Sequence, residues 1–543
     1  MQTMTVNDII VKSGNLKKIW EKRDVQLKEY YKQIQMEDEF AQENLESFVG
    51  NDPRSAYNLV VHMLNQKIPH RIKAEELDKT MMVASTQVEN FFTTAWNDIY
   101  EGYRRRGKQS FMRDLIGLLI ATGWYSVFAT ITPDGSRCMA EIWNPSTVYP
   151  YFDDDLVECA HIDTLSESSA KRMLLRNNWK AADIRGNQKL YDYWWLDSPR
   201  TDGGWNVYNA VVLGTTVAKP PTLESRMRRI PIFVSPTGGL PDTGYMSDNW
   251  SAEIGQPSIA TNSKIYRYWN KWWTFQMQIL RDTAQPKIFE QSRSTNPIIK
   301  KEDMTKRGVI WRGSPEDKVG YVSPPIIPLE LRGALLDMEA MKDRGGPSAA
   351  MFGAVAQQMT SFMMSQVSSL TAMMASAYHE GIINCLSDID NFWVQQMKDN
   401  NHAPYTFKWP KEIPDNYRIT ADYEVRVPGD MANRATVARM LNPNFRLPIL
   451  RVYDELFPEV KNPIKDIVQV RAEDAEANPV YAQIALIQAL REQSRILELY
   501  KDTEGAALFT KAADMVESTL TPPQQEQAQQ PTGQPQQQVQ PGA

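Results

Sequence analysis

The stretch from Ala349 to Asn400 constrains the fold of this chain most strongly. It contains no proline, and its apolar residues recur every three or four positions, which predicts one long α-helix. The apolar stripe consists of Val355, Met359, Met363, Val367, Leu370, Met374, Ile382, Leu386, Ile389 and Trp393. Small residues fill much of the remainder and allow neighbouring backbones to approach closely. We expect this helix to be packed in a core or between subunits rather than to form a ligand site.

Two shorter helices and a small β segment precede this helix. Periodicity predicts helices from Ser258 to Thr283 and from Leu329 to Lys342, with strand-like pieces between turns separating them. Arg344-Gly345-Gly346-Pro347 then breaks the chain, because glycine pairs and proline both end helices. The first of these helices carries on one face Ile265, Trp269, Trp272, Gln276 and Ile279.

The rest of the chain alternates between α and β segments. Residues 1–120 are mostly helical and include an exposed amphipathic helix from Asn15 to Phe48, whereas residues 124–235 are rich in strands. Strands return at YTFKW and YRITADYEVRVP, followed by helices at 430–441, 447–456 and 480–518. The Gln/Pro-rich residues from Thr521 onward cannot bury apolar surface and are expected to be disordered. The predicted fold class is mainly α with β-rich insertions, that is, α+β.

Length and charge narrow the classes of protein. At 543 residues the chain is long enough for several domains, and its 66 acidic residues exceed its 60 Lys and Arg residues, giving a formal charge of -6. Proteins that hold nucleic acid by counterion release are usually basic, so tight, static DNA binding is disfavoured. The 3 widely spaced cysteines indicate neither a disulfide framework nor a zinc site, and a reducing cytoplasm suits them.

The most apolar run, Leu115 to Thr132, is near membrane-spanning length. Gly117 and Gly123 interrupt it, and a β-rich half follows a helical half, so two consecutive buried elements are the better interpretation. The N-terminus lacks the apolar core of a signal peptide. We expect no membrane association, and a membrane-surface or pore-forming assembly is kept as an alternative.

Motifs for catalysis are scarce, since the chain has no P-loop, nucleophile elbow or H-E-x-x-H motif in a suitable context. One cluster could bind a divalent metal, because Asp153, Asp154, Asp155, Glu158, Cys159 and His161 combine carboxylates, a thiol and an imidazole. A metal-dependent nuclease using this cluster is the alternative function. We favour a solvated Asp-rich turn that leads into an edge strand. No enzyme activity and no cofactor are expected.

Two basic features could contact nucleic acid. They are Arg104, Arg105, Arg106 and Lys108, and a helical set of Lys264, Arg267 and Lys271 that alternates with aromatic residues. For the first we favour a solvated helix C-terminus with a favourable dipole interaction. For the second we favour packing of the aromatic residues between helices.

The order of these elements resembles the portal protein of tailed bacteriophages, the ring that connects head to tail. The resemblance runs over most of the chain and depends on order and spacing, since no single motif is diagnostic. It is carried by Asp114 to Ile131, by WNPSTVYP from Trp143 to Pro150, by Arg229-Ile230-Pro231-Ile232, by Ser258 to Thr283, by Gly308-Val309-Ile310-Trp311, and by the break around Arg344 to Phe352 with its long helix.

The resemblance implies a domain organisation. Residues 1–257 would hold N-terminal helices and a β-rich wing, 258–285 and 327–343 two stem helices, 286–326 a clip, and 344–352 a tunnel loop. Residues 353–429 would form a long wing helix and further wing strands, 430–520 a helical crown, and 521–543 a disordered tail.

Three groups of site residues also follow from the resemblance. The tunnel loop facing DNA would present Arg344, Gly345, Gly346, Ser348, Met351 and Phe352. The clip would contact an adaptor or terminase through Lys300, Lys301, Arg307, Trp311 and Arg312. The stem helices would pack through Trp269, Trp272 and Ile279. No catalytic, cofactor-binding or metal-binding residue is expected.

By resemblance, the chain would be a homo-oligomer with twelve subunits as the family norm. It would be made in the host bacterial cytoplasm and lie at a unique vertex of the virion capsid. Double-stranded DNA would pass through it transiently during packaging and ejection. Its partners would be a tail adaptor protein, the terminase, and the major capsid and scaffolding proteins.

Geometry agrees with a large ring. For helices spaced about 10 Å apart, six protomers leave a lumen of about 9 Å once a helix radius of about 5 Å is subtracted on each side, and ten to thirteen leave about 20 to 30 Å. A DNA duplex is about 20 Å across. Because each neutralised phosphate adds affinity, an acidic chain with a loop of small and apolar residues suits a channel that must not hold its cargo.

Overall fold

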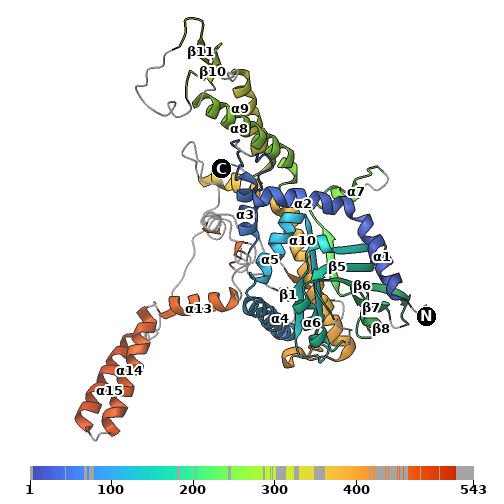
Figure 1. Cartoon of the computed structure of the whole chain (residues 1–543). Coiled ribbons are helices and arrows are strands. Elements are labelled where there is room, and N and C mark those ends of the chain that lie inside the picture. Colours follow the sequence, from blue (N-terminus) through green and yellow to red (C-terminus); the bar gives the residue numbers. More distant parts are fainter. Residues whose placement is uncertain are drawn as a thin grey trace, which may run out of the picture. The chain divides into compact units, whose positions relative to one another are not determined.

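The structure is a computed structural model, and the chain forms two compact units, Met1–Thr436 and Val437–Ala543 (Figure 1). It describes residues 4–42, 45–65, 70–72, 79–179, 184–201, 203–242, 246–284, 288–293, 295, 298–300, 313–322, 329–347, 361–414, 417–421, a few positions between 435 and 457, 463–476, 479–499 and 502–520. Helices and antiparallel sheets are both present, which confirms the α+β class.

Helices build the N-terminal part of the first unit. They are α1 (Val6–Ile19), α2 (Glu21–Gln35), α3 (Asp52–Leu64), α4 (Lys79–Arg105) and α5 (Phe111–Thr122). Thr5 and Asp8 form a capping box that starts α1, and Met36 in the left-handed conformation ends α2. The single helix expected from Asn15 to Phe48 is therefore wrong. The break falls at Trp20, whose buried indole donates a hydrogen bond of 2.8 Å to the Pro150 carbonyl.

Two antiparallel sheets follow. The first has the order β3 (Cys138–Ile142), β2 (Trp124–Ile131) and β9 (Ile232–Pro236). The second has the order β4 (Val148–Phe152), β5 (Leu156–Leu165), β6 (Gln188–Pro199), β7 (Trp205–Leu213) and β8 (Thr216–Leu223). The short 3-10 turn η1 (Pro145–Thr147) precedes β4, and α6 (Glu167–Asn177) follows β5. β8 contains Pro220 and Pro221, which it accommodates because it is the edge strand of its sheet.

The apolar run from Leu115 to Thr132 is divided between α5 and β2, as predicted. Gly123 makes the turn with a φ of 71°, and a Cβ atom there would overlap the backbone of Gln256. Within the described ranges, no helix is both long enough and apolar enough to cross a bilayer.

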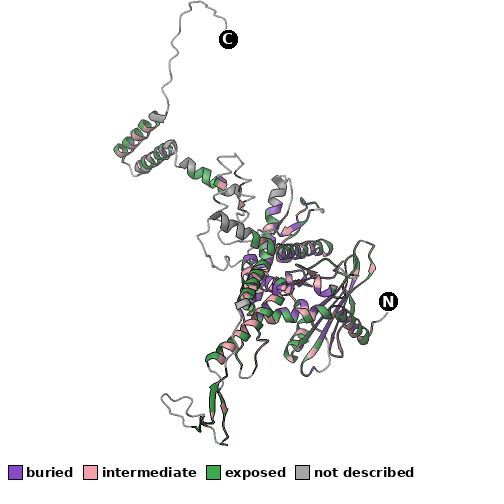
Figure 2. Cartoon of the chain, turned by 90° about the horizontal axis from the view of Figure 1, so that it is seen from above, coloured by how far each residue is buried: buried purple, intermediate pink, exposed green. Residues whose placement is uncertain are grey.

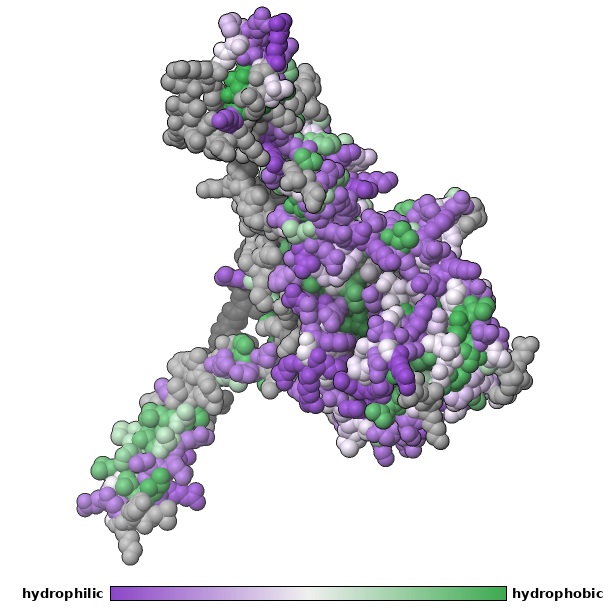
Figure 3. All heavy atoms as spheres, viewed as in Figure 1, coloured by the Kyte–Doolittle hydropathy of each residue, from purple (hydrophilic) through white to green (hydrophobic). Residues whose placement is uncertain are grey.

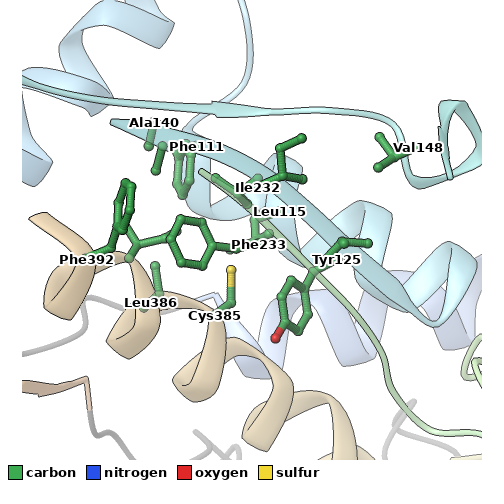
Figure 4. Close-up of a cluster of buried hydrophobic side chains, with 14 of the residues drawn as sticks. Phe111, Leu115, Tyr125, Ala140, Val148, Ile232, Phe233, Cys385, Leu386 and Phe392 are labelled. Carbon is green, nitrogen blue, oxygen red and sulfur yellow. The ribbon is translucent and has the colours of Figure 1, made fainter. Parts of the chain in front are cut away.

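The long helix is α10 (Ser361–Asn400), and its C-terminal half is the centre of the main core. Ile382, Leu386, Ile389 and Trp393 are fully buried, as the apolar stripe predicted, whereas Leu370 is 64% exposed. Figure 4 shows Cys385, Leu386 and Phe392 of this helix facing Phe233 of β9 and Tyr125 of β2. The predicted beginning of the helix, residues 349–360, lies outside the described residues.

A buried carboxylate joins α10 to the N-terminal helices. Asp390 is completely buried, lies 2.5 Å from His70 Nδ1 and accepts a hydrogen bond of 3.0 Å from the Trp96 indole. His70 belongs to β1 (His70–Ile72), which pairs with β12 (Ile419–Ala421), so this one group connects α4, α10 and a two-stranded sheet. Burial raises the pKa of Asp390, and the contacts with His70 and Trp96 oppose that rise.

The remaining elements of the first unit lie around this core or extend beyond it. They are α7 (Trp250–Glu253), η2 (Ala260–Asn262), α8 (Ser263–Ala284), β10 (Ile288–Gln291), β11 (Lys318–Tyr321), α9 (Leu329–Gly345) and η5 (Pro404–Thr406). The strand expected at YTFKW is wrong, because η5 replaces its first half and Tyr405 adopts a φ of 54°. The Tyr405 hydroxyl donates a hydrogen bond of 2.9 Å to Asp98, which draws the segment toward α4.

The second unit contains α13 (Pro463–Glu476), α14 (Pro479–Leu499) and α15 (Thr503–Leu520). α14 and α15 pack through small residues, and Ser494 donates a hydrogen bond of 2.9 Å to the Ala506 carbonyl. The continuous helix expected over 480–518 is therefore wrong. Apolar side chains remain on the surface of this helix pair (Figure 3), including Leu486, Leu508 and Met515. The helices expected at 430–441 and 447–456 lie mostly outside the described residues, as does the tail.

Replacing Asp390 with alanine should lower the free energy of unfolding by about 3 kcal/mol, because His70 and the Trp96 N–H would stay buried without their acceptor. Urea unfolding followed by tryptophan fluorescence measures this loss. The control is Asp197→Ala at an exposed carboxylate, which should change stability by no more than about 0.5 kcal/mol. Equal effects of the two substitutions would contradict the structural role of Asp390.

Candidate functional site

Helices α8 and α9 flank the β10–β11 hairpin in the sequence and pack against each other. Asn262, which is 1% exposed, donates a hydrogen bond of 2.7 Å from Nδ2 to the Lys342 carbonyl near the end of α9. The Lys342 ammonium lies 3.0 Å from Asp52 and 4.7 Å from the centre of the Trp269 ring. The segment before α8 and the end of α9 are therefore held together next to α3. Sequence analysis did not identify Asn262, although a Thr-Asn-Ser sequence before a helix is typical of a helix start.

One face of α8 is covered by residues 39–42 and 45–50, which precede α3. Thr274 accepts a hydrogen bond of 3.1 Å from the Phe48 N–H, and Asn270 accepts one of 2.9 Å from the Gly50 N–H. Arg267 lies 2.8 Å from Glu39. Side chains of α8 thus accept hydrogen bonds from backbone N–H groups of this segment. No pattern in the sequence could indicate this contact.

The predicted stem residues lie along the sides of α8 and are partly buried. Trp269 contacts Trp273 edge to face with ring centres 5.9 Å apart, and Trp272 contacts the same Trp273 at 6.1 Å. Ile279 lies two turns further along the helix. Trp269 packs within its own chain, against Lys342 of α9.

The outward face of α8 is apolar and basic. Lys264, Tyr268, Lys271 and Phe275 are spaced so that they share this face, and Tyr268 and Phe275 are 64% and 52% exposed. We call these four residues the α8 stripe. Figure 2 shows that the helices leading to the hairpin are mostly exposed or intermediate, whereas the sheets and surrounding helices contain the buried residues.

The outward surface of α9 is apolar and acidic. Leu336 and Met341 are 68% and 53% exposed, and Asp337, Glu339 and Asp343 are exposed around them. Leu336 and Met341 are five positions apart, about 140° around the helix, so these five residues spread over more than half of its circumference. We call them together the α9 stripe. The two helices of one chain therefore present large apolar groups surrounded by opposite charges, which is unusual for a surface that meets only water.

The predicted clip includes the β10–β11 hairpin, in which Ile288 to Gln291 pair antiparallel with Lys318 to Tyr321. The Glu290 carboxylate accepts a hydrogen bond of 2.6 Å from the Ile298 N–H and so orders the segment after the first strand. Lys300 is exposed, whereas the predicted clip residues Lys301, Arg307, Trp311 and Arg312 lie outside the described residues.

The predicted tunnel loop begins where α9 ends. Arg344 is exposed, and Gly345 and Gly346 lie against Asn262, where a Cβ on Gly345 would overlap the Asn262 side chain. Ser348, Met351 and Phe352 lie outside the described residues.

The proposed metal cluster at residues 153–161 is not assembled. Asp153, Asp154 and Asp155 form an exposed turn, whereas Cys159 is fully buried and His161 stacks on Trp143 at 4.1 Å. The Glu158 carboxylate accepts a hydrogen bond of 2.6 Å from Tyr193. In the part of the chain that the structure describes, no group of three or more His, Cys, Asp or Glu residues is placed to hold a metal ion. The nuclease alternative therefore loses its metal site.

The basic group at the end of α4 is held by neighbouring side chains. Arg105 lies 3.1 Å from Glu101, and Arg106 lies 3.0 Å from Glu141 with its guanidinium over the Tyr103 ring. These contacts favour the structural interpretation of this group over phosphate binding.

No protein-family model and no curated protein matches this chain. It is similar to a chain of the "Neck of empty GTA particle computed with C6 symmetry", with a TM-score of 0.39 and 10% identity over 75% of this chain and 90% of that one. It is also similar to a chain of the "Neck of native GTA particle computed with C12 symmetry", with a TM-score of 0.35 and 9% identity over 74% and 99%. At TM-scores below 0.5 these matches carry neither function nor symmetry over to this chain.

The environment of His161 makes stability depend on pH. Burial lowers the pKa of His161 from 6.5 to about 4, so the unfolded chain takes up a proton that the folded chain resists. The stabilisation is complete above about pH 6.5 and is lost as the pH falls through about 4, a change of about 3 kcal/mol. His161→Phe, which keeps a ring on Trp143, should lose correspondingly less stability between these pH values in urea unfolding. Equal losses in both proteins would show that folding does not lower the pKa of His161.

Proposed function

We propose that this chain is the subunit of a portal ring in a tailed-phage-type capsid, a non-enzymatic channel through which double-stranded DNA enters and leaves. The observation that supports it most strongly is the pair of apolar, oppositely charged stripes on α8 and α9. Identical copies side by side would cover both stripes, each contact pairing the α8 stripe of one copy with the α9 stripe of the next.

Burial of apolar groups supplies the driving force. Tyr268, Phe275, Leu336 and Met341 are all more than half exposed in the single chain. Burying a large apolar side chain completely contributes about 1.5 to 3 kcal/mol, and each interface of a ring repeats the gain. A contact of this size is substantial compared with the stability of a typical domain, about 5 to 15 kcal/mol.

Charge gives the contact its direction. The α8 stripe contributes Lys264 and Lys271, and the α9 stripe contributes three carboxylates. The two stripes are different surfaces, so their contact is head to tail, and a head-to-tail contact between identical chains closes into a ring when the rotation allows it. Helix spacing then requires about ten to thirteen copies for a lumen that admits a duplex.

The proposal also assigns a role to the hairpin, to the loop after α9 and to residues 430–520. The β10–β11 hairpin with Lys300, Lys301, Arg307, Trp311 and Arg312 would meet the terminase during packaging and the tail adaptor afterwards. The loop from Arg344 to Phe352 would face the DNA, and 430–520 would form the crown. Small and apolar residues in that loop suit weak contact, because each phosphate held by the wall would slow the passage of DNA.

The particle mass tests the ring. Native mass spectrometry of the purified protein should show an assembly near twelve times 62.1 kDa. Phe275→Glu and Leu336→Glu should each reduce the assembled fraction at least tenfold, because each places a carboxylate in the apolar contact. The matched control is Leu175→Glu on α6, where the leucine is 82% exposed outside both stripes. A monomeric or dimeric wild-type protein would overturn the proposed function.

The tunnel loop has its own test. Replacing Met351 and Phe352 together with aspartate should leave ring assembly intact and reduce the amount of DNA packaged in an in vitro packaging reaction, since the charges would change the wall that slides past the duplex. Loss of ring assembly in this variant would show that the loop is structural instead.

A further inference from the structure

A groove of about 680 Å³ lies between the α1–α2 junction and the ends of β4, β5 and β6. It is larger than the groove of about 290 Å³ beside α10. Its wall carries the ammonium groups of Lys17, Lys18, Lys28 and Lys189, which are all exposed. We call it the lysine groove. Val25, which is 60% exposed, supplies apolar surface between the charges, whereas Ile162 in the lining is buried.

The lysines of this groove are available to a partner. In the described part of the chain, none of the four ammonium groups has a carboxylate within 4.0 Å. Glu21, Asp24 and Asp163 also line the groove, but Asp24 is already bound by Arg23 at 2.9 Å. The groove therefore has a surplus of positive charge and favours an acidic partner.

The same unit carries an acidic projection, the turn between β4 and β5. Tyr151 and Phe152 are 48% and 42% exposed, and the three carboxylates of Asp153, Asp154 and Asp155 follow them. The turn is closed by a hydrogen bond of 3.0 Å from the Asp153 N–H to the Asp155 carbonyl. We call residues 151–155 the acidic finger. Among described residues, its carboxylates form no ion pair within 4.0 Å, although Arg229 lines the small pocket beside them.

The finger cannot reach the groove of its own chain. Phe152 pairs with Leu156 at the finger end of β5, whereas Asp163 and Thr164 line the groove at the other end. A strand rises about 3.3 Å per residue, so Phe152 lies about 10 Å from Tyr149 at the near edge of the groove and about 26 Å from Thr164 at its far edge, along one rigid hairpin. A contact between them has to join two copies.

We infer that the acidic finger of one copy docks in the lysine groove of the next. Phe152 would cover Val25, and the aspartates would lie among the lysines. The finger and the groove are different surfaces, so this contact is also head to tail and would add a second point of contact to each ring interface. The inference depends on the proposed ring and identifies the occupant of the groove as a second copy of this chain.

A nucleic acid fits the groove less well than the finger does. The lining carries four ammonium groups and three carboxylates, a small positive surplus rather than the continuous positive track that a nucleic-acid backbone requires. The finger brings fewer charges in a compact turn together with an apolar ring, which matches the mixed lining.

Charge reversal tests the contact. The finger variant is Asp153→Lys with Asp154→Lys, which spares Asp155 because its side chain accepts a hydrogen bond from the Leu156 N–H. The groove variant is Lys18→Glu with Lys28→Glu, both at exposed positions. Each variant alone places like charges together at every interface and should reduce the assembled fraction at least tenfold in native mass spectrometry at 0.1 M salt. Lys408→Glu with Lys411→Glu, exposed lysines outside the groove, makes the same charge change and should assemble as the wild type does.

Recombination of the variants separates a lost contact from a misfolded chain. A one-to-one mixture of the finger and groove variants should form rings again, because opposite charges meet when the two chains alternate. A single chain carrying all four substitutions should also assemble. Rings that form equally well in wild type and in both variants would overturn the finger contact and leave the proposed portal function standing. Failure of both recombinations to restore rings would overturn it as well, and a monomeric wild type would overturn both proposals.

Discussion

The burial of one side of α10 against β2, β9 and α5 is the constraint on which the rest of the first unit depends. Four apolar residues of its C-terminal half are fully buried there, and Asp390 on the same helix is held by His70 and Trp96 from two other elements. Apolar packing makes this helix the centre of the core, and the buried carboxylate selects a single arrangement around it. The strands and helices that carry the surface features are positioned by this arrangement.

A contrast in burial separates the core from α8 and α9. The core excludes water from its large side chains, whereas the two helices around the β10–β11 hairpin leave Tyr268, Phe275 and Leu336 largely exposed. Their inner faces are nonetheless ordered by specific hydrogen bonds, such as those from Phe48 and Gly50 to side chains of α8. A well-held helix pair with an uncovered apolar exterior is what a subunit of a larger assembly requires, and opposite charges on the two helices favour a head-to-tail contact.

Local patterns in the sequence predicted the elements better than the contacts between them. The ends of α5 and β2 follow from Ser110, the apolar period and Gly123, all of which act over a few residues. Several errors fall where a residue contacts a partner far away in the sequence. The N-terminal helix is interrupted at Trp20, whose indole donates a hydrogen bond to the carbonyl of Pro150. Tyr405 is not in the expected strand, and its hydroxyl donates a hydrogen bond to Asp98. The metal cluster is not assembled either, since packing buries Cys159 and stacks His161 on Trp143.

By itself the sequence determined the α+β class, the order of elements, the long helix after a glycine-proline break, and an acidic chain unsuited to gripping DNA. These depend on periodicity, turn chemistry and net charge, which are properties of neighbouring residues or of the whole composition. Only the tertiary structure decided that Asn262 ties α8 to α9, that lysines from two helices and a strand share one groove, and that the acidic finger lies at the far end of the same hairpin. Those relations join residues far apart in the chain, and their geometry is set by packing around α10 rather than by any local pattern.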